Sequence, residues 1–149
     1  MRVYLVIMDE TEEARKALRF ASRRAAATGG AVHILALVQP QNFNAFGGVQ
    51  ATIEKEAHDR AEAIAHSAAG NLFTESGKMP KIAVRVGEGQ AVIKEYLADN
   101  EEIAALVLAA DEDTPGPLVQ HFSANAGSLP CPLYIIPGTF SMDDVDRMA

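Results

Sequence analysis

The chain has 149 residues, of which 48% are hydrophobic and 22% charged, and its formal net charge is −7. This length suits one domain with a buried core, and the composition excludes a largely disordered chain and a membrane protein. The acidic balance, 20 Asp and Glu against 13 Lys and Arg, argues against a nucleic-acid partner, which needs a basic surface. A single cysteine excludes an internal disulfide, and with no secretory segment we expect a cytoplasmic protein.

The first forty residues predict a strand, a helix and a second strand. Residues 3–8 form a short apolar run that is typical of a strand buried on both faces and is too short to span a membrane. Thr11 is the predicted N-cap of a helix in which apolar residues recur with helical spacing until Gly29 and Gly30. Residues 31–38, AVHILALV, predict the second strand.

The alternation of strands and helices continues along the chain. After a polar loop over residues 39–50, the spacing of Ile53, Ala57, Ala61 and later apolar residues predicts a long helix over 52–75. The remaining predicted elements are a strand over 81–86, a helix over 91–98, a strand over 103–110, a weakly helical stretch over 118–126 and a strand over 132–137. Residues 138–149 are predicted to form a polar, acidic tail.

This order of elements predicts an α/β fold. Near-continuous apolar strands that alternate with helices indicate a five-stranded parallel sheet with helices on both faces, in a single domain over residues 2–137. Ligands of such sheets bind beyond the carboxyl ends of the strands, at the point where the strand order reverses. The loops after Met8, Val38, Val86 and Ala110 are therefore the places to search for a site.

Several segments, taken in order, resemble the universal stress protein family. The residues that carry the resemblance are VIMDETEEARKAL over 6–18, VRVG over 84–87, ALVLA over 105–109 and CPLYII over 131–136. The resemblance covers nearly the whole chain and implies a five-stranded parallel fold of the adenine nucleotide α hydrolase-like type. It also implies a homodimer in which the last strand, Leu133 to Ile136, meets its twofold mate.

The sequence departs from this family at the nucleotide loop. ATP-binding members carry the pattern Gly-x2-Gly-x9-Gly-Ser/Thr between the fourth strand and fourth helix, where backbone N–H groups reach the phosphates. Here the segment over 109–120 reads AADEDTPGPLVQ and is shorter than the pattern requires. Counting back from Cys131 places Val119 and Gln120 at the Gly-Ser position. Gly127-Ser128 lies too close to Cys131 for that role, and we interpret it as a helix C-cap and turn.

The resemblance carries a set of candidate nucleotide-binding residues to this chain. They are Asp9, Val38, Ala109, Asp111, Gly116, Val119 and Gln120. Asp9 matches the carboxylate that family members place beside the nucleotide, and Val38 matches the position whose backbone meets adenine. The residues themselves leave two alternatives open, because Asp9 could instead cap the following helix and Val38 could be a core residue.

Acidic residues occupy the loop where a triphosphate would lie. Asp111, Glu112 and Asp113 are consecutive, and no Lys or Arg occurs between Lys94 and Arg147. Each close pair of like charges costs about 1 kcal/mol near a protein surface. We therefore expect no ATP and no resident cofactor. The alternative is a rebuilt loop that binds ATP or AMP, with Mg²⁺ bridging the carboxylates and phosphates and with weak ATPase activity.

No catalytic or metal-binding motif is recognisable. The chain has no Gly-x-Ser-x-Gly elbow, no Walker A sequence, no GxGxxG and no HExxH, so we expect no enzyme, no catalytic residue and no metal. The four histidines do not have zinc-site spacing; His58 and His66 lie eight residues apart with no third ligand evident. Cys131 precedes a proline at the start of a strand and is interpreted as a small core residue.

The first helix concentrates basic charge. Its cationic residues are Arg15, Lys16, Arg19, Arg23 and Arg24. They form either a solvated helix face or a docking surface for an acidic partner, such as the acidic tail of the same or another subunit. The function that we expect is a non-enzymatic, homodimeric stress-response or regulatory module with an unknown protein partner, without nucleic acid and without a membrane.

Overall fold

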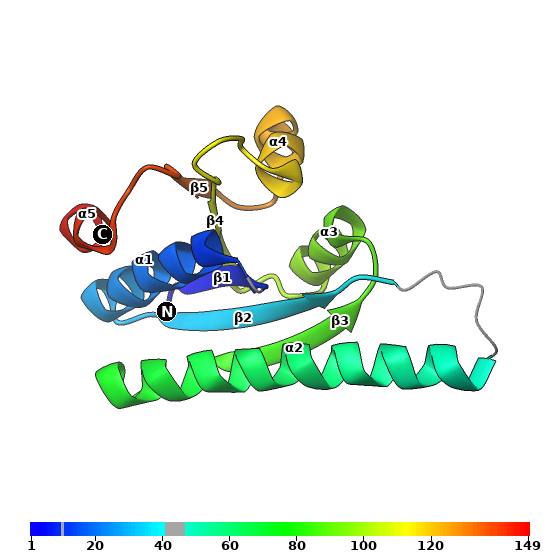
Figure 1. The fold of residues 1–149 in the computed structure, drawn as a ribbon. Helices are drawn as coiled ribbons and strands as arrows, with labels where there is room; N and C mark the ends of the chain where they lie inside the picture. The colour runs from blue at the N-terminus through cyan, green and yellow to red at the C-terminus, as the bar shows by residue number, and fades with distance from the viewer. Residues whose placement is uncertain (10, 41–46) are drawn as a thin grey trace.

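Five strands and five α-helices alternate along the part of the chain that the computed structural model describes, residues 1–9, 11–40 and 47–149 (Figure 1). In chain order they are β1 (Val3–Met8), α1 (Glu12–Thr28), β2 (Ala31–Val38), α2 (Gly47–Ser76), β3 (Lys81–Val86), α3 (Gly89–Asp99), β4 (Ile103–Ala109), α4 (Pro117–Ala124), β5 (Leu133–Ile136) and α5 (Met142–Met148). Half of the predicted loop over 39–50, residues 41–46, lies outside the described residues.

All five strands belong to one parallel sheet with the order β3-β2-β1-β4-β5, which confirms the predicted fold class. The chain moves outward from β1 through β2 to β3 and then returns to the other side of β1 as β4. The strand order therefore reverses between β1 and β4, and their carboxyl ends form the switch point at which ligands of such sheets bind. The edge strands are β3 and β5.

Helices cover both faces of the sheet, as the apolar strands require. Along β1, Tyr4 and Val6 pack with residues of α1, α2 and α5, whereas Leu5 and Ile7 pack with residues of α3 and α4. Successive side chains of a strand point to opposite faces, so the two core clusters follow directly from this alternation. Among the described helices, none combines the length and the apolar character that crossing a lipid bilayer demands.

Two helices begin at least two residues earlier than predicted. The N-terminal boundary of α2 is Gly47, whereas apolar spacing placed it at residue 52. The boundary of α3 is Gly89 because the Glu88 side chain caps it, accepting hydrogen bonds from the backbone N–H groups of Gln90 and Ala91 at 3.1 and 3.0 Å. Caps set helix ends through local hydrogen bonds, which apolar periodicity does not report.

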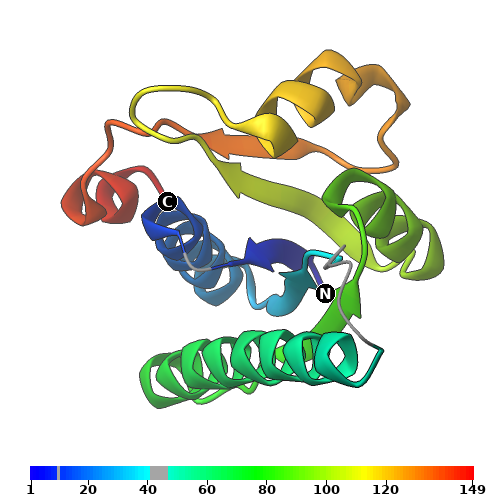
Figure 2. The ribbon, with the colours of Figure 1, turned by 45° about the vertical axis from the view of Figure 1, so that its right-hand side comes forward.

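Residues 138–149, predicted as a polar, acidic tail, are partly helical. They contain α5, which begins with a capping box in which Ser141 and Asp144 exchange hydrogen bonds between side chain and backbone. Val145 is fully buried in the core cluster that includes α1. Figure 2 shows α5 (red) beside α1 (blue). The helix escaped prediction because it has seven residues and a single buried side chain, too few for an apolar period.

Candidate functional site

Asp9 lies at the switch point, directly after β1, and organises the turn into α1. One oxygen of its carboxylate, Oδ1, accepts hydrogen bonds from the backbone N–H of Thr11, at 2.9 Å, and from the Thr11 hydroxyl. Thr11 is the N-cap of α1, as predicted, and its hydroxyl accepts from Ala14 N–H at 3.3 Å. Asp9 thus supports the cap, while its exposed side chain still faces the hollows beside it.

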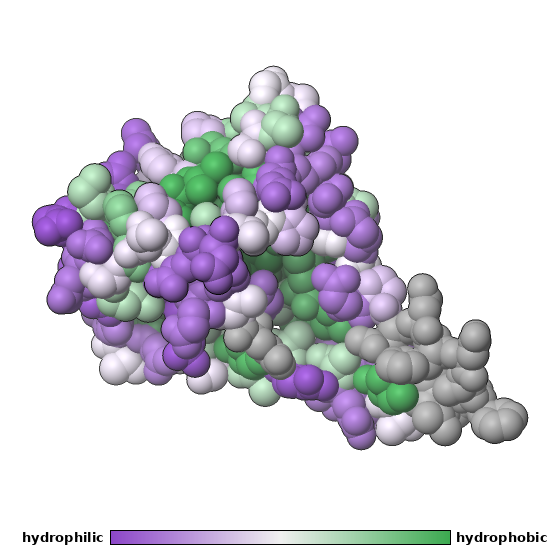
Figure 3. Space-filling model, turned by 45° about the horizontal axis from the view of Figure 1, so that its top comes forward, coloured by the Kyte–Doolittle hydropathy of each residue, from purple (hydrophilic) through white to green (hydrophobic). Residues whose placement is uncertain are grey.

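Two small hollows flank Asp9. The first, of about 280 Å³, lies on the α2 side and is lined by Met8, Asp9, Leu37, Val38, Gln39, Ala57, Arg60, Ala61 and Ile64. The second, also of about 280 Å³, lies on the α4 side and is lined by Ile7, Asp9, Thr11, Glu13, Ala14, Ala17, Leu108, Ala109 and residues 115–119. The surface in Figure 3 shows apolar side chains recessed between hydrophilic ones on the face that it presents.

The hollows bring most of the candidate residues together. Asp9, Val38, Ala109, Gly116 and Val119 line one or both of them. Val38 is also a core residue, 5% exposed, so only a small part of it faces the hollow.

Asp111 and Gln120 are placed differently and line neither of these hollows. The Asp111 carboxylate accepts a hydrogen bond from the backbone N–H of Glu112 at 2.8 Å. The backbone N–H of Gln120 donates to the Gly116 carbonyl at 3.0 Å, which closes the first turn of α4, and its side chain is exposed. Both residues therefore serve local turns in this structure.

The start of α4 offers few donors to an anion. A helix normally presents free N–H groups in its first turn, and these groups bind phosphate. Here Pro117 occupies the first helical position and has no N–H. Gly116 precedes it with φ of 84° and ψ of 159°, a backbone conformation that favours glycine. The glycine thus serves the turn into the helix.

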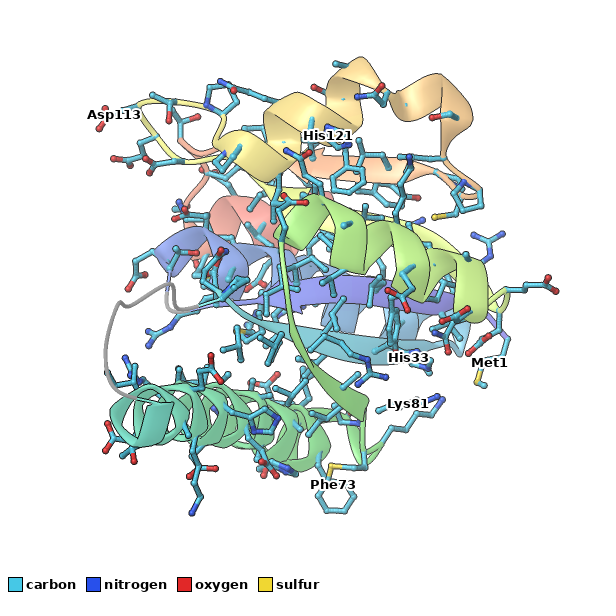
Figure 4. All side chains as sticks on the ribbon, turned by 90° about the vertical axis from the view of Figure 1, so that its right-hand side faces the viewer. Met1, His33, Phe73, Lys81, Asp113 and His121 are labelled. Carbon is cyan, nitrogen blue, oxygen red and sulfur yellow. The ribbon has the colours of Figure 1, made fainter. Side chains whose placement is uncertain are left out.

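Carboxylates dominate the loop between β4 and α4. The side chains of Asp111, Glu112 and Asp113 are all exposed, and Figure 4 shows Asp113 pointing outward from this loop. Glu13 of α1 lines the second hollow and adds a further carboxylate. Within the described part of the chain, none of these three loop residues forms an ion pair with a lysine or arginine.

Arg60 is a site residue that the sequence reasoning missed. It lies on α2 and lines the first hollow together with Asp9 and Val38, so this end of the site contains a cation. A signal was available, because Arg60 is spaced three residues after Ala57 and four before Ile64, which places it on the same helix face.

A larger groove of about 790 Å³ continues from Asp9 along the space between α1 and α2. Its apolar floor includes Leu18, Ile64 and Leu72, and residues of α5 line it at Met142, Asp143 and Asp146. This groove could not be foreseen because α5 was expected to be a tail.

The histidines do not join this site. His33 is buried on β2, 7% exposed, and its Nδ1 lies 3.5 Å from the Tyr96 hydroxyl. Burial lowers the pKa of His33, and the neighbouring charge of Lys81 lowers it further. In Figure 4, His33 and Lys81 lie far from Asp113.

The two histidines of α2 do have a third potential ligand between them, contrary to the sequence prediction. Glu62 lies 3.7 Å from a ring nitrogen of His58 and 3.7 Å from one of His66. Among the described residues, ligand atoms of His58, Asp59 and Glu62 lie within 4.8 Å of one another on an exposed part of the helix. Four-residue spacing on α2 produces this arrangement.

Cys131 is half-buried and packs against the core cluster beneath α3 and α4, as predicted. Burial raises the pKa of its thiol, which keeps it in the unreactive protonated form. Gly127-Ser128 belongs to a short 3-10 turn, Ala126–Ser128, which confirms the prediction of a turn. The predicted role as helix C-cap is wrong, because α4 ends at Ala124 and Asn125 is its C-cap.

The comparison with family models decides the family. Residues 1–137 match the model described as Universal stress protein family. The chain belongs to this family. A search of curated proteins finds no match at a significant level.

Solved structures of other family members share the fold of this universal stress protein. UspA from Lactobacillus plantarum superposes with a TM-score of 0.78 at 18% identity, over 91% of this chain and 97% of that chain. The Archaeoglobus fulgidus protein in complex with dAMP gives 0.62 at 17% identity, over 91% and 97%. An Arabidopsis thaliana family protein with AMP bound gives 0.62 at 13% identity, over 92% of each chain. At these identities the likeness shows the fold.

Proposed function

We propose that this universal stress protein is a non-enzymatic regulatory module that does not bind ATP. The observation that carries the proposal is the run of three exposed carboxylates, Asp111, Glu112 and Asp113, in the loop that follows β4 at the switch point. A triphosphate that extended from the hollows along this loop would approach these carboxylates, at a cost of about 1 kcal/mol for each close like-charge pair. A cytoplasmic location and a role in stress response stay predictions from the sequence.

The start of α4 supports the same proposal. Pro117 has no N–H, so the first turn of α4 offers an anion one donor fewer than a first turn without proline. The N–H groups of Leu118 and Val119 are what this turn retains for an anion. An anion site at the start of a helix depends on several converging N–H groups. The few N–H donors at the start of α4 therefore offset little of the repulsion between a phosphate and the loop carboxylates.

A second candidate function is the binding of an adenine mononucleotide such as AMP or cyclic AMP. The specific observation in its favour is that the two hollows meet at Asp9, and that the first contains Val38 and Arg60. Together they are large enough for a small ligand, and Arg60 supplies one cation for one phosphate. Relatives in complex with cAMP, dAMP and AMP support the same ligand class.

A thermal-shift screen with ATP, AMP and cyclic AMP, each with and without Mg²⁺, tests the two functions. A ligand at 100 times its Kd stabilises a protein by about 2.7 kcal/mol, which gives a clear rise in Tm. We expect no rise with ATP in either condition, and a rise with ATP would overturn the proposal. A rise with AMP or cyclic AMP alone, lost in the Arg60→Gln variant, would establish the second candidate.

We propose further that the protein is a homodimer through Leu133–Ile136. In its support, β5 is an edge strand, and an apolar edge invites pairing with another chain. Ile135 is 38% exposed, whereas Tyr134 on the other side of the strand rests against Phe20, with ring centroids 5.4 Å apart. Sedimentation equilibrium should show a dimer that the Ile135→Lys variant dissociates. A single 15.9 kDa species for the wild-type chain would contradict the dimer.

A further inference from the structure

Residues 138–149 lie beyond the segment that matches the family model, yet they contact α1 closely. The contact has a polar half and an apolar half, and its two halves together define a surface on α1. We name this the α1 docking surface. It comprises Lys16, Arg19 and Arg23 together with the apolar side chains of α1 and the sheet that form one core cluster with Val145.

The polar half centres on a single carboxylate. The guanidinium of Arg19 holds Asp146 through two parallel bonds, Nε to Oδ1 at 2.7 Å and Nη2 to Oδ2 at 3.0 Å. Arg23 adds Nε to Oδ1 at 2.7 Å, and the Lys16 ammonium donates to the Gly138 carbonyl at 3.0 Å. Two-point pairing of arginine with a carboxylate fixes orientation as well as charge.

The apolar half of the contact holds Val145, the residue directly before Asp146. Val145 is fully buried and belongs to the same core cluster as Ala17, Phe20 and Ala21 of α1. Phe140 is half-buried and packs against that cluster. The α1 docking surface therefore recognises a short pattern, an aliphatic side chain followed directly by a carboxylate, presented on one turn of helix.

Helix α5 has little stability apart from this contact. It has seven residues, and isolated helices of that length are marginal in water. Met142 and Met148 are 40% and 60% exposed, so Val145 is its single buried residue. The segment thus behaves as a short peptide docked on a preformed surface, and five residues, 137–141, connect it to β5.

We propose that the α1 docking surface binds an acidic, amphipathic helical segment of a partner protein, and that α5 is its intramolecular occupant. The charge complementarity between the arginines and Asp146, and the seated segment itself, argue for this occupant. A short tether gives the attached segment an effective concentration in the millimolar range. A partner segment of equal intrinsic affinity therefore binds only when α5 is released, which makes the contact autoinhibitory. This inference does not depend on nucleotide binding.

A labelled peptide tests the proposal on the full chain. A fluorescein-labelled peptide of residues 138–149 is titrated with wild-type protein and with the Asp146→Arg variant, whose own α5 is repelled by Arg19 and Arg23. We expect saturable anisotropy for the variant, with an apparent affinity at least about tenfold higher than for the wild type, as removal of a tethered competitor requires. Adding Arg19→Glu to the variant, or replacing Asp146 with Asn in the peptide, should remove the binding.

Equal binding to wild type and variant, or no binding to a folded variant, would overturn the proposal. Circular dichroism establishes that the variant is folded. Should it not fold, hydrogen exchange on the wild type decides: several millimolar unlabelled peptide should speed exchange of the α5 amides severalfold, and unchanged exchange would overturn the proposal. Exchange that slows with protein concentration would show that α5 of a second copy occupies the surface, which would also overturn intramolecular occupancy.

Discussion

Two acidic segments of this protein, the loop after β4 and helix α5, have the same kind of side chain in opposite surroundings. In the loop, Asp111, Glu112 and Asp113 are exposed, and the described part of the chain provides them with no ion pair to lysine or arginine. In α5, Asp146 lies between Arg19 and Arg23. One segment repels anions, and the other binds cations of its own chain.

The placement of cations, more than the number of acidic residues, decides whether an acidic segment repels anions or docks on its own chain. The first helix supplies Arg19 and Arg23 to α5, whereas it supplies no ion pair to the described residues of the loop after β4. Gly138 joins the two regions, because its carbonyl accepts from Lys16 and its backbone lies against that of Asp111.

The largest loss of stability is expected from a charged side chain at the buried position of α5. In the Val145→Asp variant the new carboxylate cannot remain buried without a partner, so α5 leaves α1 and the burial of a valine is lost. We expect the free energy of unfolding to fall by about 2–3 kcal/mol. Urea unfolding followed by circular dichroism measures it. Met148→Asp adds the same charge to the exposed face of α5 and should change little.

A smaller loss of stability is expected from a substitution at Gly138, where the segment before α5 meets the loop after β4. A Cβ atom on residue 138 would lie 2.2 Å from the Asp111 carbonyl oxygen, so Gly138→Ala must displace backbone. Such overpacking costs about 1–3 kcal/mol, which a shift in the urea midpoint would report. Gly127→Ala is the matched control, because no heavy atom other than those of its chain neighbours lies within 4 Å of the added Cβ there. Equal midpoints for the two variants would show that the junction is not tight.

The smallest effect is expected from lowering the pH, which protonates Asp146. The hydrogen bond from Arg19, together with the charges of Arg19 and Arg23, lowers the pKa of Asp146. A carboxyl whose pKa is lowered on folding stabilises the folded state above its unfolded pKa of about 3.9, and this contribution is lost as the pH falls through the folded pKa. The α5 amide resonances should therefore shift below about pH 4. In Asp146→Asn the shift should shrink, and an identical shift would contradict the assignment to this pair.

The fold could be predicted from the sequence because its strands are marked by apolar runs that are recognisable on their own. Runs such as residues 3–8 and 31–38 are apolar throughout, and parallel sheets bury such strands on both faces. Helix α5 was not accessible in the same way. Its position depends on Arg19 and Arg23, more than a hundred residues away in the chain, and a pattern within 138–149 cannot show that contact.

The candidate site could be predicted only in part from the sequence. Asp9, Val38 and Gly116 follow from the switch point and the family resemblance, and the structure places all three at the hollows. Arg60 reaches the first hollow from α2, not from a loop after a strand. Its spacing from Ala57 and Ile64 places it on their helix face, but only the packing of α2 on the sheet shows that this face borders the site.

The carboxylates after β4 and the proline at the start of α4 should exclude a triphosphate from the switch point, and calorimetric titration of the wild-type protein with ATP and Mg²⁺ measures this. We expect no saturable heat for ATP up to about 1 mM, which corresponds to a binding free energy weaker than about −4 kcal/mol. Saturable, stoichiometric binding of ATP within that range would contradict this exclusion.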